Sequence, residues 1–120
     1  MGTVLVVEDS LTDMEIMTRH LQQLGLSVVS ANSGEEAQAK LHSQKPNLII
    51  LDVILPGQSG FELCREIKTD PDTSQIPVVI CSTKDTDVDK MWATMLGADA
   101  YLPKPVERTE LLRTIRQLIK

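Results

Sequence analysis

The chain has 120 residues, 42% of them hydrophobic, which is enough for one domain with an apolar core. Its formal net charge of −5 opposes binding to nucleic acid or to an anionic membrane, because the long-range field has the wrong sign. No apolar run reaches the about 18 residues of a membrane span, and no charged-then-apolar leader is evident. We therefore expect residues 1–120 to form a single cytoplasmic domain with protein partners, no DNA partner and no membrane contact.

Short apolar segments rich in β-branched residues recur along the chain and predict five strands. They cover residues 4–7, 28–29, 48–51, 78–81 and 100–102. Three of these are continuous apolar runs, which is typical of parallel strands covered on both faces. Apolar residues at helical spacing follow each strand, within residues 14–24, 37–41, 61–67, 88–95 and 111–118. The five repeats predict a doubly wound α/β fold, which binds ligands at the carboxyl ends of its strands.

Two short motifs predict where helices begin. Thr12 with Glu15, and Ser33 with Glu36, have the spacing of a capping box. This spacing predicts that two helices begin at Thr12 and Ser33.

The two cysteines do not suggest a metal or disulfide site. Cys64 and Cys81 lie in apolar stretches, without CxxC spacing or a nearby pair of histidines. We interpret both as small, reduced, buried hydrophobic residues.

Polar residues follow four of the five predicted strands. They are Glu8 and Asp9 after the first, Asp52 after the third, Ser82 and Thr83 after the fourth, and Lys104 just past the fifth. Any one of the Asp, Ser or Thr residues could simply cap the next helix. Because parallel strands end at one edge of a sheet, we instead expect the whole set to converge there.

Clustered carboxylates need a counter-charge. Two like charges about 4 Å apart cost about 4 kcal/mol at an effective dielectric near 20, whereas a whole domain is stable by only about 5–15 kcal/mol. Lys104 supplies one positive charge. An all-oxygen cluster is also the ligand set of a hard divalent cation, so we infer Mg²⁺ as cofactor. A metal beside a carboxylate, a hydroxyl and a lysine suits phosphoryl transfer to an aspartate.

Four segments resemble, in order and spacing, the receiver domains of bacterial two-component response regulators. They are "VLVVEDS", "LIILDVILPGQSG", "PVVICSTKD" and "GADAYLPKPV", within a match from Thr3 to Lys120. The resemblance implies a flavodoxin-like (βα)5 sandwich with a five-stranded parallel sheet of order 2-1-3-4-5. It also implies a single receiver domain over residues 1–120, without an effector domain, so that output passes through another protein.

The resemblance assigns roles to the acidic residues. Asp52 would accept a phosphoryl group from a phosphohistidine of a sensor histidine kinase. Asp9, Asp52 and the main-chain oxygen of Ile54 would hold Mg²⁺, and Glu8 would reach the metal through water. Self-phosphotransfer and autodephosphorylation are the only catalysis expected, so the chain is not an enzyme in the usual sense.

The resemblance also implies a switch. Ser82 and Lys104 would contact the phosphoryl oxygens, with a cis peptide before Pro105. Phosphorylation adds about −1.5 to −2 charge units, and Ser82 would move toward it while Tyr101 rotates inward. The face formed by the fourth helix, fifth strand and fifth helix would then change for a protein partner. On the residues alone, Tyr101 is equally an ordinary aromatic at the edge of the core.

Three positions near the expected site leave the phosphoryl lifetime open. Thr83 replaces the usual small residue after the hydroxyl and could hinder an attacking water. Ile54 and Lys84 occupy variable flanking positions and could act on hydrolysis in opposite directions.

The segment "STKDTDVDKMW" resembles stand-alone receivers of pilus-motility and phototaxis systems, which belong to twitching-type chemotaxis clusters. Trp92 falls in one helical stripe with Val88, Met91 and Met95, which predicts a partly buried core residue. As the only tryptophan it could instead anchor a partner.

Specific residues argue against two other functions. An aspartyl-phosphate hydrolase needs a second Asp two residues after the nucleophile, where this chain has Ile54. A flavodoxin-like cofactor binder needs a Ser/Thr-rich phosphate loop where this chain has "EDSLTD", whose acids would repel a flavin phosphate. A phosphate sink or relay, a phosphorylation-independent adaptor and a phosphorylation-linked homodimer remain open from sequence.

Overall fold

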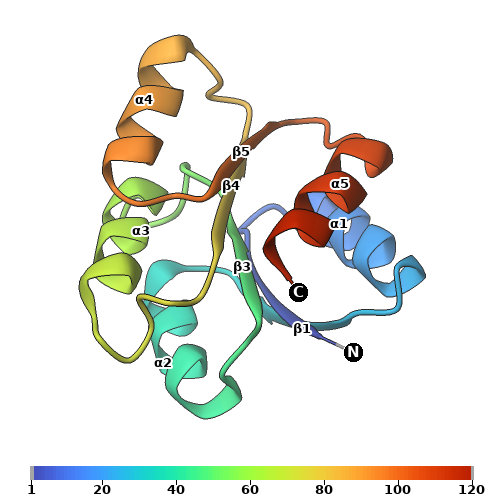
Figure 1. The fold of residues 1–120 in the computed structure, drawn as a ribbon, viewed down its shortest axis with the longest axis horizontal. Coiled ribbons are helices and arrows are strands. Elements are labelled where there is room, and N and C mark those ends of the chain that lie inside the picture. The colour runs from blue at the N-terminus through green and yellow to red at the C-terminus, as the bar shows by residue number, and fades with distance from the viewer. Residues whose placement is uncertain (1, 120) are drawn as a thin grey trace.

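A computed structural model describes residues 2–119 as five strands alternating with five helices (Figure 1). The strands are β1 Thr3–Val7, β2 Ser27–Ala31, β3 Leu48–Leu51, β4 Val78–Ser82 and β5 Ala100–Pro103; the helices are α1 Leu11–Gln23, α2 Gly34–Gln44, α3 Gly60–Thr69, α4 Asp87–Met95 and α5 Arg108–Leu118. All strand pairs are parallel and the strand order is β2-β1-β3-β4-β5. The predicted flavodoxin-like α/β fold and its strand order are confirmed.

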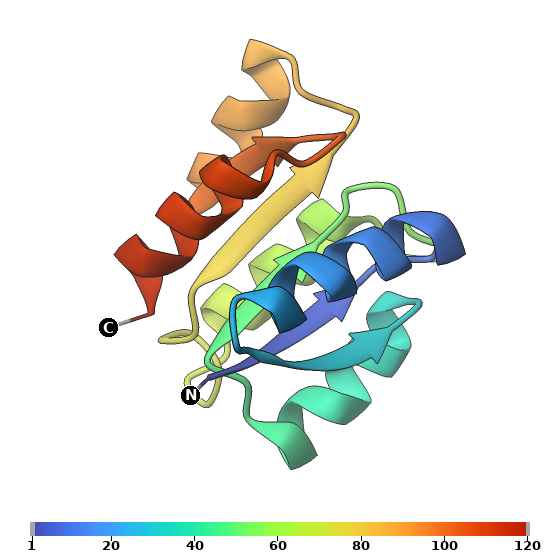
Figure 2. The same ribbon diagram turned by 90° about the vertical axis from the view of Figure 1, so that its right-hand side faces the viewer.

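The helices cover both faces of the sheet. Helices α1 and α5 lie on one face, and α2, α3 and α4 lie on the other (Figures 1 and 2). Side chains alternate along β1, so that Val4 and Val6 pack with Leu21 of α1, whereas Leu5 packs with Leu63 of α3. The central strands are apolar along most of their length because both of their faces are buried, with Thr3 at the start of β1 and Ser82 at the end of β4 as exceptions. Among residues 2–119, no helix is both long and apolar enough to cross a membrane.

The cap of helix α1 lies two residues before the predicted cap at Thr12. The hydroxyl of Ser10 accepts a hydrogen bond from the Asp13 N–H at 3.2 Å, so Ser10 is the N-cap. The prediction at Thr12 was wrong, because Ser10 fulfils the same role. Asp13 consequently lies in the first turn of α1. The prediction at Ser33 is confirmed, since its hydroxyl accepts from the Glu36 N–H at 3.1 Å.

Helix α4 contradicts the prediction of a core stripe. Its four large apolar side chains are all more than half exposed: Val88, Met91, Trp92 and Met95. Ala93 is the only residue of α4 that the structure buries. Because α4 lies over the edge strand β5 and beside α3, one small residue is enough for its contact with the core. The apolar spacing predicted a helix correctly but assigned the wrong face to the interior.

Both cysteines are free and buried, as predicted. Burial raises the pKa of the Cys64 thiol to about 11 and that of the Cys81 thiol to about 12. Neither thiol therefore ionises near neutral pH, which is consistent with a packing role.

The start of α3 packs directly on the backbone that follows β3. The Gly60 N–H donates to the Val53 carbonyl at 2.8 Å, and a Cβ on Gly60 would lie 2.0 Å from the Asp52 carbonyl oxygen. Backbone cannot rotate away as a side chain can, so only glycine fits. Gly57, in the same loop, has a φ of +77° but open space around it.

These two glycines give a matched pair of substitutions. Gly60→Ala should lower the free energy of unfolding by about 3 kcal/mol, because α3 must separate from Asp52. Gly57→Ala should cost only about 1 kcal/mol, from backbone strain alone. Urea denaturation followed by circular dichroism measures both values. A Gly60→Ala protein no less stable than Gly57→Ala would contradict the close packing described above.

Candidate functional site

The strands all run in one direction, so their carboxyl ends share one edge of the sheet (Figure 2). Asp52 lies at this edge directly after β3 and is 6% exposed. Its N–H donates to the Val7 carbonyl at 3.1 Å, which ties it to the end of β1. One carboxylate oxygen, Oδ1, accepts from the Ile54 N–H at 3.1 Å, and the other, Oδ2, accepts from Lys104 Nζ at 2.6 Å. The carboxylate is therefore held in one orientation.

The ammonium group of Lys104 joins three carboxylates. Besides Asp52 it contacts Glu8 after β1 and lies 2.9 Å from Asp13 Oδ2 in the first turn of α1. The Lys104 side chain is 12% exposed and that of Glu8 is 7% exposed. One positive charge thus faces three negative charges, which leaves an excess of two negative charges in a partly desolvated place.

The pKa shifts reflect this environment. Burial raises the pKa of Glu8 above its ordinary value, although hydrogen bonds from Lys104 and the Ser10 N–H act in the opposite direction. Burial alone would lower the pKa of Lys104, but its hydrogen bonds to Asp52, Glu8 and Asp13 raise it. The lysine therefore stays charged, and the unbalanced charge of the site is negative.

A divalent cation fits the donor set by charge and by atom type. Asp52 and Glu8 place oxygens around the same ammonium nitrogen, and the neighbouring Asp9 is exposed to solvent. Oxygen donors with excess negative charge are the environment that hard divalent cations prefer. Within residues 2–119, however, no three His, Cys, Asp or Glu side chains are arranged to hold a metal ion. The ammonium of Lys104 lies among the carboxylates instead.

Ser82 and Tyr101 both form hydrogen bonds to the backbone of Lys84. Ser82 is fully buried at the end of β4, and its Oγ accepts from the Lys84 N–H at 3.2 Å. Tyr101 lies on the adjacent strand β5, and its hydroxyl donates a hydrogen bond to the Lys84 carbonyl. The start of the loop between β4 and α4 is thus held at both sides by the two residues expected to form a switch.

Lys104 is positioned by the neighbouring strand. Its N–H donates to the Ser82 carbonyl at 3.1 Å, which extends the β4–β5 pairing past Pro103. The Lys104–Pro105 peptide bond is cis, as the family resemblance implied.

The structure brings together Glu8, Asp52 and Lys104 as the sequence predicted, and adds Asp13, which the sequence analysis missed. The segment "EDSLTD" already contains the information that could have placed Asp13 near the site. With Ser10 as the cap, Asp13 falls in the first helical turn, on the side of the strand end.

A carboxylate on α3 holds the loop that follows Asp52. Glu66 accepts from Gln58 Nε2 in the loop at 2.7 Å and from Gln38 Nε2 on α2 at 3.0 Å. A Cβ on Gly34, at the start of α2, would lie 2.4 Å from Gln58 Oε1. The loop is therefore joined to two helices beside the site.

Tyr101 is the only tyrosine in the chain, so its ionisation can be followed by ultraviolet absorbance. Burial, and after it the nearby Asp89, Asp52 and Asp85, raises the pKa of Tyr101 to about 12. At a pH of about 11 the native phenol should remain mostly neutral, whereas the urea-unfolded phenol, with a pKa near its ordinary value of about 10, should be ionised. Because the folded pKa is raised, the stability that Tyr101 contributes is present below about pH 10 and is lost as the pH rises toward 12.

Tyr101→Phe is the control, since it should abolish the absorbance change. Equal ionisation of native and unfolded protein at pH of about 11, with circular dichroism showing the native fold, would contradict the buried, hydrogen-bonded phenol.

Comparisons with known proteins show the family to which the chain belongs. The family model described as response regulator receiver domain matches residues 4–116. The chain is 39% identical to protein PilH of Pseudomonas aeruginosa, over 99% of this chain and 98% of that protein. The crystal structure of chemotaxis protein CheY4 of Vibrio cholerae is similar with a TM-score of 0.91, 30% identity and 98% coverage of both chains.

A further similar structure is the receiver domain of sensor histidine kinase PA1611 from Pseudomonas aeruginosa, with a magnesium ion coordinated in its active site cleft. Its TM-score is 0.90 at 26% identity, covering 98% of this chain and 97% of that chain. Receiver domains act in two-component signalling with histidine kinases and downstream proteins, and are not classical enzymes. The fold, the buried strand-end aspartate with its lysine, and the family match together show that this chain belongs to the response regulator receiver domains.

Proposed function

We propose that the chain is a single-domain response regulator that accepts a phosphoryl group on Asp52 from a sensor histidine kinase in a Mg²⁺-dependent step. The observation that supports this most directly is the Asp52 carboxylate, which is buried at the strand edge between the Ile54 N–H and the Lys104 ammonium. These two donors orient the group while leaving it next to the rim where a phosphodonor can approach.

The transfer itself is a displacement at phosphorus. A carboxylate oxygen of Asp52 forms a bond to the phosphorus of a phosphohistidine as the phosphorus–nitrogen bond breaks, and the electron pair of that bond returns to the imidazole nitrogen. Lys104 and Ser82 contact the phosphoryl oxygens and stabilise their charge. Autodephosphorylation would be the attack of water on the same phosphorus, which breaks its bond to the Asp52 oxygen, restores the carboxylate and releases inorganic phosphate.

In this proposal Asp9, Asp52 and the main-chain oxygen of Ile54 would hold Mg²⁺, with Glu8 contributing through water. When bound, the ion would supply positive charge to the phosphoryl oxygens. Lys104 then need not balance three carboxylates alone, so it is free to turn toward the phosphoryl group.

The switch is proposed to run through Lys84. A phosphoryl group on Asp52 adds about −1.5 to −2 charge units and attracts the Ser82 hydroxyl, which now accepts from the Lys84 N–H. Loss of that hydrogen bond frees the loop that also holds the Tyr101 hydroxyl. Tyr101 then turns inward, and the face formed by α4, β5 and α5 changes for a protein partner.

The similarity to PilH supports a role in the cytoplasmic control of pilus-based motility, with a downstream protein as the output partner. Within the same proposal, a sink or relay role would use the same acceptor site but a different recipient of the phosphoryl group.

Phosphorylation is tested with acetyl phosphate and intact-mass measurement. We expect one added phosphoryl group with Mg²⁺ present and at least tenfold slower labelling after the metal is chelated. Asp52→Asn should abolish labelling, whereas Asp72→Asn, which removes an exposed acid elsewhere, should not change it. Labelling that persists in Asp52→Asn would show that another residue is the acceptor and would contradict the proposal.

Metal binding is tested without any phosphodonor. Millimolar Mg²⁺ should raise the thermal midpoint, because a ligand that binds only the folded state stabilises it. Asp9→Asn should reduce this rise, and Asp87→Asn, which removes the same charge from α4, should leave it intact. An identical midpoint with and without Mg²⁺, together with no heat of binding by calorimetry, would exclude the metal site.

A further inference from the structure

A groove between α3 and α4 is lined by apolar side chains that the proposed switch does not use. Phe61 of α3 and Val88, Trp92 and Leu96 on the α4 side form its apolar lining, and its volume is about 460 Å³. This volume is within the range of about 300–1,000 Å³ that binding pockets have. We refer to it as the α3–α4 groove.

The rim of the groove continues into exposed apolar surface. Val88 and Met91 are each 56% exposed, Trp92 is 52% exposed and Met95 is 71% exposed. Residues three, four and seven apart lie on one side of a helix, so these four side chains form one contiguous patch. Single exposed apolar residues are ordinary, but a contiguous patch of this kind marks an interaction surface.

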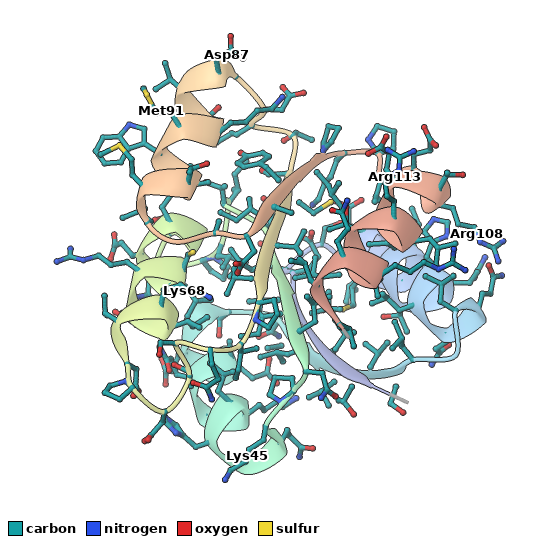
Figure 3. All side chains as sticks on the ribbon, in the orientation of Figure 1. Lys45, Lys68, Asp87, Met91, Arg108 and Arg113 are labelled. Atoms are coloured by element: carbon teal, nitrogen blue, oxygen red, sulfur yellow. The ribbon has the colours of Figure 1, made fainter. Side chains whose placement is uncertain are left out.

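The patch lies on the side of α4 that is turned away from α5. Met91 points outward from α4 on the side opposite to α5 (Figure 3). The groove is shared with α3 and contains none of Glu8, Asp52 and Lys104. A partner in the groove would therefore leave the phosphorylation site accessible.

The charges around the groove favour a partner surface that carries both acidic and basic groups. Glu62 and Arg65 lie on α3, and Lys84 and Asp89 lie at the other wall, so each wall carries one acidic and one basic residue. Within residues 2–119, Arg65 and Lys84 take part in no ion pair. A partner with charge of one sign would meet attraction and repulsion in equal measure. A second copy related by a two-fold axis can present acidic groups to basic groups in both directions.

Long-range electrostatics also favour the α3–α4 groove as the place where two copies meet. Each chain has a net charge of −5, so two copies repel each other at most approaches. The four charged residues of the groove sum to zero. Contact through this locally neutral, apolar surface therefore adds no local repulsion to the repulsion between the two net charges.

We propose that the α3–α4 groove joins two copies of this chain in a symmetric dimer that buries Trp92, Met91 and Met95 between them. The dimer forms without phosphorylation of Asp52 and does not depend on the function proposed above.

The first test measures association of the unphosphorylated protein, without Mg²⁺ or a phosphodonor. Sedimentation over a wide concentration range should show the mass rising from one chain to two. Emission of Trp92, the only tryptophan, should shift to shorter wavelength along the same curve as its side chain becomes buried. Added salt should strengthen the association, because it screens the repulsion between two negative chains.

Two variants locate the interface. Met95→Glu and Leu11→Glu each add one negative charge at a highly exposed apolar position, 71% and 87% exposed respectively, so both should fold normally. Met95→Glu should weaken the dimer at least tenfold, whereas Leu11→Glu on α1 should leave its dissociation constant unchanged.

Three outcomes would overturn the proposal. The wild-type protein could stay monomeric with unchanged Trp92 emission at every concentration, which would leave the groove to a different protein. The dimer could persist unchanged in Met95→Glu, or both variants could weaken it equally, and then the interface lies elsewhere. None of these results bears on labelling of Asp52, so the two proposals fail independently.

Discussion

The contact of one lysine with three carboxylates organises the functional end of this molecule. Lys104 Nζ lies against Glu8, Asp13 and Asp52, which come from the end of β1, the first turn of α1 and the end of β3. Without the ammonium, three negative charges would repel each other in a place with little water. The lysine stabilises the arrangement but still leaves it negative, which is the environment that a divalent cation favours.

Much of this arrangement could be predicted from the sequence, because the relevant signals are local. Continuous apolar runs indicated parallel strands, and polar residues directly after them had to share one edge of the sheet. That reasoning correctly brought together Glu8, Asp52 and Lys104. It missed Asp13, because the position of a helix start depends on which of two hydroxyl residues, Ser10 or Thr12, captures a free backbone N–H. This difference of two residues in the position of the cap decides which side chains of the first turn face the site.

Helix α4 shows a second limit of prediction from the sequence. Periodicity reports that a helix has an apolar side but not whether the fold provides anything to cover it. The helix lies over an edge strand, where Ala93 alone makes the buried contact and Trp92 remains half exposed. Whether the apolar side of a helix is covered depends on the strand order and on the neighbouring helices, which are features of the tertiary structure. The same tertiary placement makes the apolar side of α4 available to a second protein chain.

The distances along the chain within the lysine cluster have a consequence for biosynthesis. Lys104 and Glu8 are 96 residues apart in sequence, and Lys104 and Asp52 are 52 apart. Contacts of such long range form only when the connecting chain is already organised. While the polypeptide is still on the ribosome and its fifth strand has not emerged, the acids have no lysine to neutralise them. The cluster of Lys104 with its three carboxylates therefore cannot assemble until β5 has emerged, and until then Glu8, Asp13 and Asp52 remain unneutralised.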